Sequence, residues 1–344
     1  MPASPVNPAT PLPTTVPPPT ATFTATNTPL PTARPTPIPA ARVMLGDQAL
    51  FYGDWERALA EFSEALETSP DEEVRYAARL GIARTHFLSG ELVEAQVILE
   101  EMKSDASFVP LQAEVSFLLA QTYQAQENYH SAADTYTRYL ELRPGVIDSH
   151  VNELRGDVLF AAGDYPAAIA AYQAALGAPR LDSSLEIEFK MAQAYDLSGE
   201  LATALVAYED IYSRTANDFM RAKLDYRLGQ IYLDLGEDEQ AYNKYLDAVM
   251  NYPRSYDSYL ALVDLVETGL PVDEFQRGLV DYYAGQYAVA IAAFDRYMQS
   301  DGADVATALY YKGLAQSGFG EYQAAIETWD EIIQSHPDSE VWDK

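Results

Sequence analysis

The chain has 344 residues, and its 52 acidic residues against 22 basic ones give a formal net charge of −30. A surface this acidic repels polyphosphates, which excludes nucleic acid and anionic membrane surfaces as main partners. The absence of cysteine excludes disulfides, thiolate metal sites and cysteine nucleophiles, and no run reaches the roughly 18 apolar residues of a membrane helix.

Residues 1–40 differ from the rest of the chain in composition. They hold 13 of the 21 prolines and ten threonines, with Arg34 as their one charged residue. Such a segment cannot build a core and favours an extended, hydrated path. We expect a disordered Pro/Thr-rich tether that acts as a spacer; a tail without a role is the alternative. The composition resembles the tethers of exported bacterial proteins. This resemblance implies a location in the cell envelope or outside the cell. Export would require a signal sequence, which is not present in this sequence.

From residue 41 onward the chain repeats one pattern eight times. The pattern is anchored on a glycine in seven copies, and the anchors are Gly53, Gly90, Glu127, Gly163, Gly199, Gly236, Gly285 and Gly320. Five residues after each anchor stands an alanine: Ala58, Ala95, Ala132, Ala168, Ala204, Ala241, Ala290 and Ala325. Nine residues after it stands a large side chain: Phe62, Leu99, Tyr136, Tyr172, Tyr208, Tyr245, Phe294 and Trp329. Seven residues before it stands a small residue: Gly46, Ala83, Ala120, Gly156, Ala192, Gly229, Gly278 and Gly313.

Each copy predicts two helices joined by a tight turn. The anchor glycine ends the first helix because it tolerates the left-handed conformation of a helix C-terminus. The polar residue after the anchor opens the second helix, whose positive end favours acidic side chains. The alanine and the large residue are four apart, so they share one face of the second helix. The small residue lets the two helices approach, and the large side chain fills the groove beside their contact.

Seventeen residues after the anchor, four copies have a proline: Pro70, Pro144, Pro253 and Pro337. These positions resemble the small, tyrosine, glycine, alanine, aromatic and proline slots of the tetratricopeptide repeat. The resemblance covers about residues 38–344 and implies an all-α fold, a right-handed superhelical solenoid of antiparallel helix pairs with about eight units. Units one to six fall in residues 41–255, and units seven and eight in residues 272–344. Residues 256–271 between them predict an extra helix and turn, with a long loop as the alternative. Because no capping helix follows Ile333, we expect the array to continue past Lys344 into a further unit.

No arrangement of residues predicts an active site, a metal site or a cofactor. The four histidines are scattered, and we expect His86, in the tyrosine slot of a first helix, to be a packed core residue rather than a ligand. The glycines of GLAQSGFG (residues 313–320) have places in the repeat and match no phosphate-binding motif. We therefore expect a protein without catalytic residues.

In the repeat family, the slots three before and one after the small residue face a concave groove. Here these slots hold the following pairs: Phe117 and Gln121, Glu153 and Asp157, Phe189 and Gln193, Tyr226 and Gln230, Phe275 and Leu279, Tyr310 and Leu314. Aromatic rings that bury side chains, beside amides that bond a backbone, suit an extended peptide. The alternative is that the rings support the stacking of neighbouring first helices. The lysine and asparagine clamp with which the family binds acidic tails is missing, and Glu153 and Asp157 would repel such a tail.

Two functions from different classes are compatible with these observations. The first is a non-catalytic scaffold, exported and tethered at the cell envelope, that binds a protein or peptide partner in its groove; an assembly lipoprotein with similar repeats belongs to the same class. The second is a supporting role beside a peptidoglycan-cleaving enzyme. It depends on a resemblance to the helical region of soluble lytic murein transglycosylases, which lies in residues 272–298 (VDEFQRGLVDYYAGQYAVAIAAFDRYM) and the helix before them. That resemblance implies a role in positioning peptidoglycan for a catalytic domain that this chain lacks.

Overall fold

The structure, a computed structural model, describes residues 37–105, 109–181, 183–300 and 302–342. Most of the predicted tether lies outside these ranges, so its disorder stays a prediction. The first helix, α1 (Pro39–Phe51), begins two residues before residue 41, where the first unit was expected to start. Proline is well suited to this place, because its φ is fixed near the helical value and the first turn needs no donor from it.

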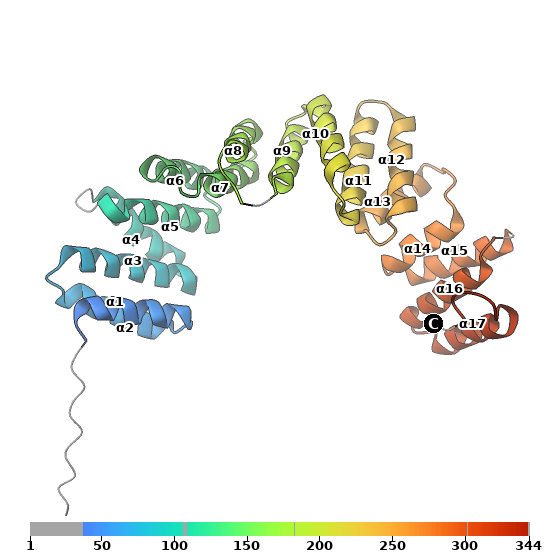
Figure 1. Cartoon of the computed structure of the whole chain (residues 1–344), viewed down its shortest axis with the longest axis horizontal. Helices are drawn as coiled ribbons and strands as arrows, with labels where there is room; N and C mark the ends of the chain where they lie inside the picture. The colour runs from blue at the N-terminus through green and yellow to red at the C-terminus, as the bar shows by residue number, and fades with distance from the viewer. Residues whose placement is uncertain (1–36, 106–108, 182, 301, 343–344) are drawn as a thin grey trace, which may run out of the picture. The chain divides into compact units, whose positions relative to one another are not determined.

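Seventeen α-helices make up the described part of the chain, and no strand occurs in it. Sixteen of them form eight consecutive pairs (Figure 1). The first helices of the pairs are α1, α3 (Glu72–Ser89), α5 (Gln112–Ala125), α7 (Asp148–Ala161), α9 (Leu185–Leu197), α11 (Asp218–Asp234), α14 (Glu274–Tyr283) and α16 (Val305–Phe319). The second helices are α2 (Trp55–Thr68), α4 (Leu92–Ser104), α6 (Tyr129–Leu142), α8 (Tyr165–Gly177), α10 (Leu201–Arg214), α12 (Asp238–Asn251), α15 (Tyr287–Gln299) and α17 (Tyr322–Ser335). A short 3-10 turn, η1 (Val109–Leu111), precedes α5. The predicted all-α array of helix pairs is confirmed.

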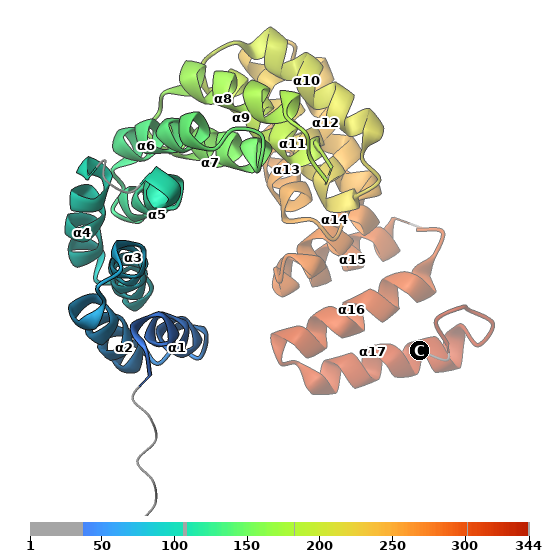
Figure 2. The same ribbon diagram turned by 60° about the vertical axis from the view of Figure 1, so that its left-hand side comes forward.

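Every anchor residue adopts the left-handed backbone conformation expected at the end of a first helix. The seven anchor glycines have φ between 73° and 93°, and Glu127, with φ of 60°, is the one described non-glycine residue with a positive φ. The residue after the anchor is the N-cap of the second helix, and in two units, at Asp54 and Asp164, its side chain accepts a backbone hydrogen bond. The turn therefore reverses the chain within two residues, so that the helices of a pair run side by side, as α16 and α17 do in Figure 2.

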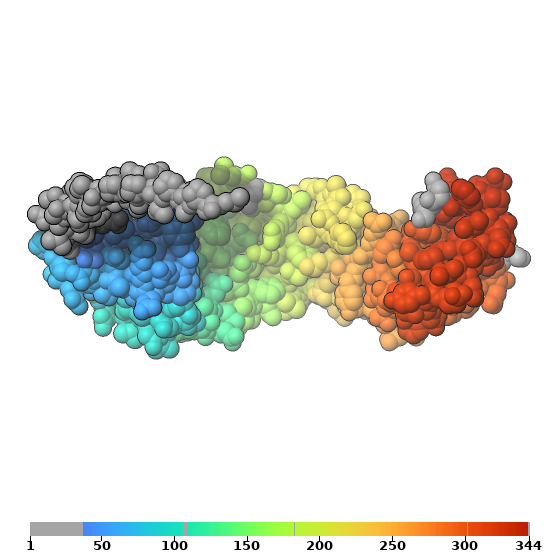
Figure 3. Space-filling view, turned by 90° about the horizontal axis from the view of Figure 1, so that it is seen from below, coloured from blue at the N-terminus to red at the C-terminus, as the bar shows by residue number. Residues whose placement is uncertain are grey.

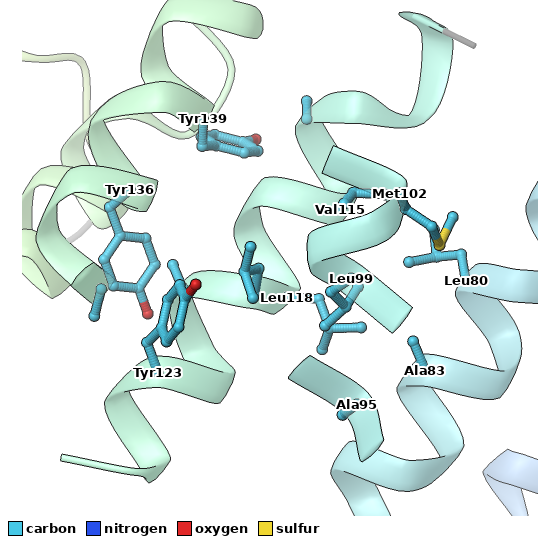
Figure 4. Close-up of a cluster of buried hydrophobic side chains, with 14 of the residues drawn as sticks. Leu80, Ala83, Ala95, Leu99, Met102, Val115, Leu118, Tyr123, Tyr136 and Tyr139 are labelled. Carbon is cyan, nitrogen blue, oxygen red and sulfur yellow. The ribbon is translucent and has the colours of Figure 1, made fainter. Parts of the chain in front are cut away.

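The core runs through the pairs and between them. All eight repeat alanines are buried, and seven of the eight large residues nine after the anchor are also buried, with Trp329 half-buried. Figure 4 shows this core in units two and three, where Leu99 and Met102 of α4 lie between side chains of α3 and α5. Each of these second helices thus has its own first helix on one side and the next unit on the other.

The seventeenth helix, α13 (Tyr256–Glu267), lies between units six and seven, where an extra helix was expected. It packs against both helices of unit six, as the first helix of a following unit would, and α14 then packs against α13. Its buried face, Ala261, Leu262 and Leu265, shares a cluster with Tyr245 of α12. Neighbouring elements remain in contact along the chain through this irregular step (Figure 3). No helix in the described ranges is both long and apolar enough to cross a membrane.

Candidate functional site

The candidate site is built where the second helix of a unit meets the small residue of its first helix. A Cβ placed on Gly156 would lie 2.4 Å from Cε1 of Tyr172, and one on Gly229 would lie 2.3 Å from Cε1 of Tyr245. Both distances are far below van der Waals contact, so the tyrosine ring passes directly beneath the glycine backbone. The predicted pairing of a small slot with a large one is confirmed in these units.

Because the tyrosine ring passes under the first helix, the tyrosine hydroxyl lies near polar residues on the far side of that helix. Four consecutive units have tyrosine in this slot, and all four rings are buried: Tyr136, Tyr172, Tyr208 and Tyr245. The hydroxyl of Tyr136 donates to Oε1 of Gln124 at 2.9 Å, and that of Tyr172 donates to Oδ1 of Asp157 at 2.9 Å. The hydroxyls of Tyr208 and Tyr245 are buried without a hydrogen-bond partner among the described residues.

Electrostatics keep these tyrosines protonated. Burial, followed by the charge of Asp157, raises the pKa of Tyr172 far above its usual range. Burial raises the pKa of Tyr245 in the same way, with Asp264 of α13 as the next cause. A buried phenol near a carboxylate stays neutral because its anion would be both desolvated and repelled. Each hydroxyl is therefore a fixed donor and acceptor at neutral pH.

The predicted groove aromatics lie against these same rings. The ring centroids are 5.9 Å apart for Phe117 and Tyr136, 5.7 Å for Phe189 and Tyr208, 5.6 Å for Tyr226 and Tyr245, and 5.9 Å for Phe275 and Phe294. Phe189 is only 5% exposed, while Phe117, Tyr226 and Phe275 are half-buried. These aromatics thus pack between the two helices of one unit. Phe275 also contacts Tyr311 of the next first helix, α16, which is the kind of contact that the alternative, stacking between neighbouring first helices, expects. The contact of these aromatics with a peptide stays a prediction.

Units seven and eight differ from the others at the predicted groove slots. Phe275 also contacts Tyr297 and Tyr311, with centroids 5.3 and 6.4 Å away, and Leu279 is buried. Tyr310 belongs to another cavity, of about 270 Å³, which it lines together with Trp329. The twelve residues at the predicted groove slots therefore do not form one uniform surface.

The acidic pair Glu153 and Asp157 is bound from within the chain. Nζ of Lys190, on α9, lies 2.8 Å from Oε1 of Glu153 and 2.9 Å from Oδ2 of Asp157 on α7. Burial alone would lower the pKa of Lys190, but the hydrogen bonds to the two carboxylates outweigh it and the pKa is raised. Lys190, which the repeat pattern does not place here, leaves the pair one net negative charge and joins unit four to unit five. The repulsion of an acidic tail by this pair stays a prediction.

The three glutamines at the predicted groove slots differ in whether their side chains form hydrogen bonds within the described part of the chain. Gln121 and Gln193 are half-buried, and no hydrogen bond from either side chain is found in the described part of the chain. Gln230 instead accepts a hydrogen bond of 2.6 Å from Nη1 of Arg227, and the other end of Arg227 pairs with Asp196. Two of the three predicted amides are thus available to a ligand through both their donor and their acceptor.

A cavity of about 370 Å³ opens beside Gln230, at the junction of α9, α11 and α13. Its polar lining consists of Asp196, Arg227, Gln230, Asp234, Tyr245 and Asp264. Sequence reasoning found Gln230 but missed the others. Tyrosine in the same slot of four consecutive units was the available signal for Tyr245, whereas Asp264 lies on the helix that breaks the repeat.

Metal and histidine chemistry have no centre among the described residues. No group of three or more histidine, aspartate or glutamate side chains in these ranges is placed to hold a metal ion. His86, expected in the core, is half-buried near the end of α3, and its Nδ1 lies 2.5 Å from Oε2 of Glu91. Glu91, the polar residue after the anchor Gly90, forms a hydrogen bond with the ring, so His86 is part of the turn rather than of the core.

Comparison with known proteins identifies the repeat that the chain contains. Two sequence profiles, both described as Tetratricopeptide repeat, match residues 50–108 and residues 117–184, 153–219 and 275–340, which together exceed half of the chain. No curated protein matches the sequence.

Among solved structures, a tetratricopeptide repeat protein from Parabacteroides merdae ATCC 43184 is 14% identical, with 81% of this chain and 98% of that chain covered and a TM-score of 0.47. YrrB, described as a TPR protein with an unusual peptide-binding site, is 21% identical, with 59% and 96% covered and a TM-score of 0.45. PilF of Pseudomonas aeruginosa is 20% identical, with 66% and 97% covered and a TM-score of 0.44.

Proposed function

This chain belongs to the tetratricopeptide repeat family, and we propose that it is a non-catalytic scaffold that binds an extended segment of a protein partner along its first helices. The observation that carries the proposal is the pair of half-buried amides, Gln121 and Gln193, that have no hydrogen bond to any other described residue. Because an amide both donates and accepts, it can bond the N–H and the C=O of a peptide backbone.

The aromatic side chain beside each amide is already packed within its own unit. Phe117 precedes Gln121 by four residues and lies against Tyr136 and Tyr139, with centroids 5.9 and 5.5 Å away. Phe189 precedes Gln193 by four residues and is buried against Tyr208. Side chains that are already fixed lose little conformational entropy on binding, which favours recognition of a flexible peptide.

The ring packing decides which substitutions can test this function. Alanine at Phe189 or Tyr226 would remove the ring that supports Tyr208 or Tyr245, so lost binding could reflect a disturbed helix pair. Alanine at Gln121 and Gln193 removes the amides without disturbing these ring pairs. Gln334, exposed on the second helix α17, provides a matched control.

The experiment measures the affinity of peptides selected from a random library for binding to the unmodified chain. The double variant Gln121→Ala/Gln193→Ala should bind them about tenfold more weakly or worse, because each lost hydrogen bond is worth about 0.5–1.5 kcal/mol. Gln334→Ala should bind with unchanged affinity. Peptides that bind the double variant as tightly as the unmodified chain would contradict the proposed function.

We further propose that the scaffold is exported and held at the cell envelope by residues 1–40. The support is their composition, 13 prolines and ten threonines with one charge, which suits a hydrated spacer. Protease should digest the chain in cells whose cell wall and any outer membrane have been opened while the cytoplasm stays enclosed, and digestion only after full lysis would contradict this location.

A second candidate function is the positioning of peptidoglycan for a lytic transglycosylase domain. The observation in its favour is α13, the additional helix directly before residues 272–298, which carry that resemblance. Sedimentation of the chain with purified peptidoglycan would support this role, and a chain that stays in the supernatant while it binds peptides would rule it out.

A further inference from the structure

The cavity at the junction of α9, α11 and α13 has features that the repeat pattern does not account for. We propose that it binds the cationic side chain of a lysine or arginine in the partner segment, an inference that rests on the proposed function and names the chemistry of its ligand. The site depends on α13, a helix without a counterpart in the other described units, because α13 supplies the wall that carries Asp264.

The charge of the cavity is unbalanced. Three carboxylates, Asp196, Asp234 and Asp264, face one guanidinium, that of Arg227. Arg227 is already engaged, since one nitrogen pairs with Asp196 and another donates to Gln230 at 2.6 Å. No ion pair forms at Asp234 or Asp264 among the described residues, so two carboxylates remain to attract a cation.

A second, independent observation is the hydroxyl of Tyr245. Its side chain is fully buried, lines the cavity, and has no hydrogen-bond partner in the described part of the chain. Burial, followed by the charge of Asp264, raises the pKa of Tyr245, so its hydroxyl stays neutral near this carboxylate. A buried hydroxyl without a partner is costly to the fold and is rare in native proteins, so a donor or acceptor from outside would complete it.

The lining also explains why a long cationic side chain suits the cavity better than a bare ion. Ile231 and Leu233 form an apolar wall along which the methylene stem of lysine or arginine can lie, while its charged end reaches the carboxylates. The described carboxylates are not arranged as a metal site. The overall net charge of −30 adds long-range attraction for a basic segment.

The probe is N-acetyl-lysine methylamide, with N-acetyl-norleucine methylamide as the uncharged control of similar stem length. The readout is the methyl NMR signal of Leu233, which is 37% exposed at the cavity wall. We expect a saturable shift with the lysine probe that weakens as salt is added, and no shift with norleucine.

Three variants decide whether the cavity is responsible. Asp264→Asn should weaken the lysine probe about tenfold, and Tyr245→Phe should weaken it about threefold. Asp134→Asn, the same charge change on an exposed residue of α6, should leave the affinity unchanged. Equal losses in Asp264→Asn and Asp134→Asn, or shifts spread over acidic surface far from Leu233, would mean non-specific attraction and would overturn the proposal.

The outcome can be separated from that of the proposed function. Selected peptides that depend on Gln121 and Gln193 but bind Asp264→Asn normally would leave the scaffold function standing and overturn the cationic site. A lysine probe that binds at Asp264, in a chain that selects no peptide at all, would support the cavity and contradict the scaffold function.

Discussion

The close approach of Gly229 to Tyr245 makes a quantitative prediction about Gly229→Ala. The new methyl carbon would lie 2.3 Å from Cε1 of Tyr245, whereas carbon atoms in ordinary contact are about 3.5–4.0 Å apart. The ring or the helix must therefore move by more than about 1 Å. Tyr245 is fully buried and lies against Tyr226, so the ring must shift toward the cavity that it lines, or the two helices must separate.

Two opposing terms set the magnitude of the effect. Overpacking a core costs about 1–3 kcal/mol, whereas replacing glycine by alanine inside a helix gains about 0.5–1 kcal/mol. The net expectation is a loss of about 0.5–2 kcal/mol in the free energy of unfolding. Units three and five contain Ala120 and Ala192 at the same slot with tyrosine opposite, so a helix pair can be built around this methyl. This favours the lower half of the range.

The assay is urea unfolding followed by circular dichroism, together with hydrogen exchange of α11 and α12, because repeat arrays can open one unit at a time. Gly177→Ala is the control, since a methyl there would meet nothing within 4 Å. The double variant Gly229→Ala/Tyr245→Leu should lose less stability than the sum of its single changes, because the smaller side chain leaves room for the methyl. Faster exchange is expected only around Gly229. A Gly229→Ala chain as stable as the original, or a Gly177→Ala chain equally weakened, would refute the packing argument.

Three further predictions follow from charges and backbone conformation. Burial raises the pKa of Asp225 and of Asp281 from 3.8 to about 6. At a pH between these two pKa values, the folded chain therefore binds more protons than the unfolded chain. The free energy of unfolding should therefore fall as pH rises through this window, by roughly 1–3 kcal/mol per carboxyl, and Asp225→Asn should flatten the dependence in urea titrations at about pH 5 and pH 7.5. Glu127→Gly should raise the urea midpoint, with a gain of about 0.5–1 kcal/mol, because glycine adopts the φ of 60° without strain; a lower midpoint would contradict this. Lys190→Met should cost about 1–2 kcal/mol by leaving two carboxylates unpaired, and adding Glu153→Gln should restore part of the loss; no recovery would show that the ion pair is not the cause.

The fold was predictable because its determinants lie at fixed spacings along the chain. A left-handed turn requires glycine at the anchor, and the close approach of two helices requires a small residue opposite a large one. Both requirements recur at Gly156 with Tyr172 and at Gly229 with Tyr245. The extra helix was predictable because residues 256–267 have helical apolar spacing of their own.

The site was less predictable because side-chain partners come from outside the repeat. Spacing places Glu153 and Asp157 on one side of α7, but it does not show that Lys190 of the next unit lies between them. Spacing also does not distinguish an aromatic ring that faces a ligand from one that supports the second helix, which is how Phe189 is placed. The sequence pattern could not predict which side of its helix Asp264 lies on, because α13 has no counterpart in the other described units.

The most direct test of the central claim is site-specific photo-crosslinking to a selected peptide. A photoreactive residue replaces Gln193 on the first helix α9 or, as the control, Val206 on the second helix α10, which is 64% exposed. Binding along the first helices predicts crosslinks from position 193 and none from position 206. Crosslinks from position 206 alone would place the partner on the opposite helices and contradict the account.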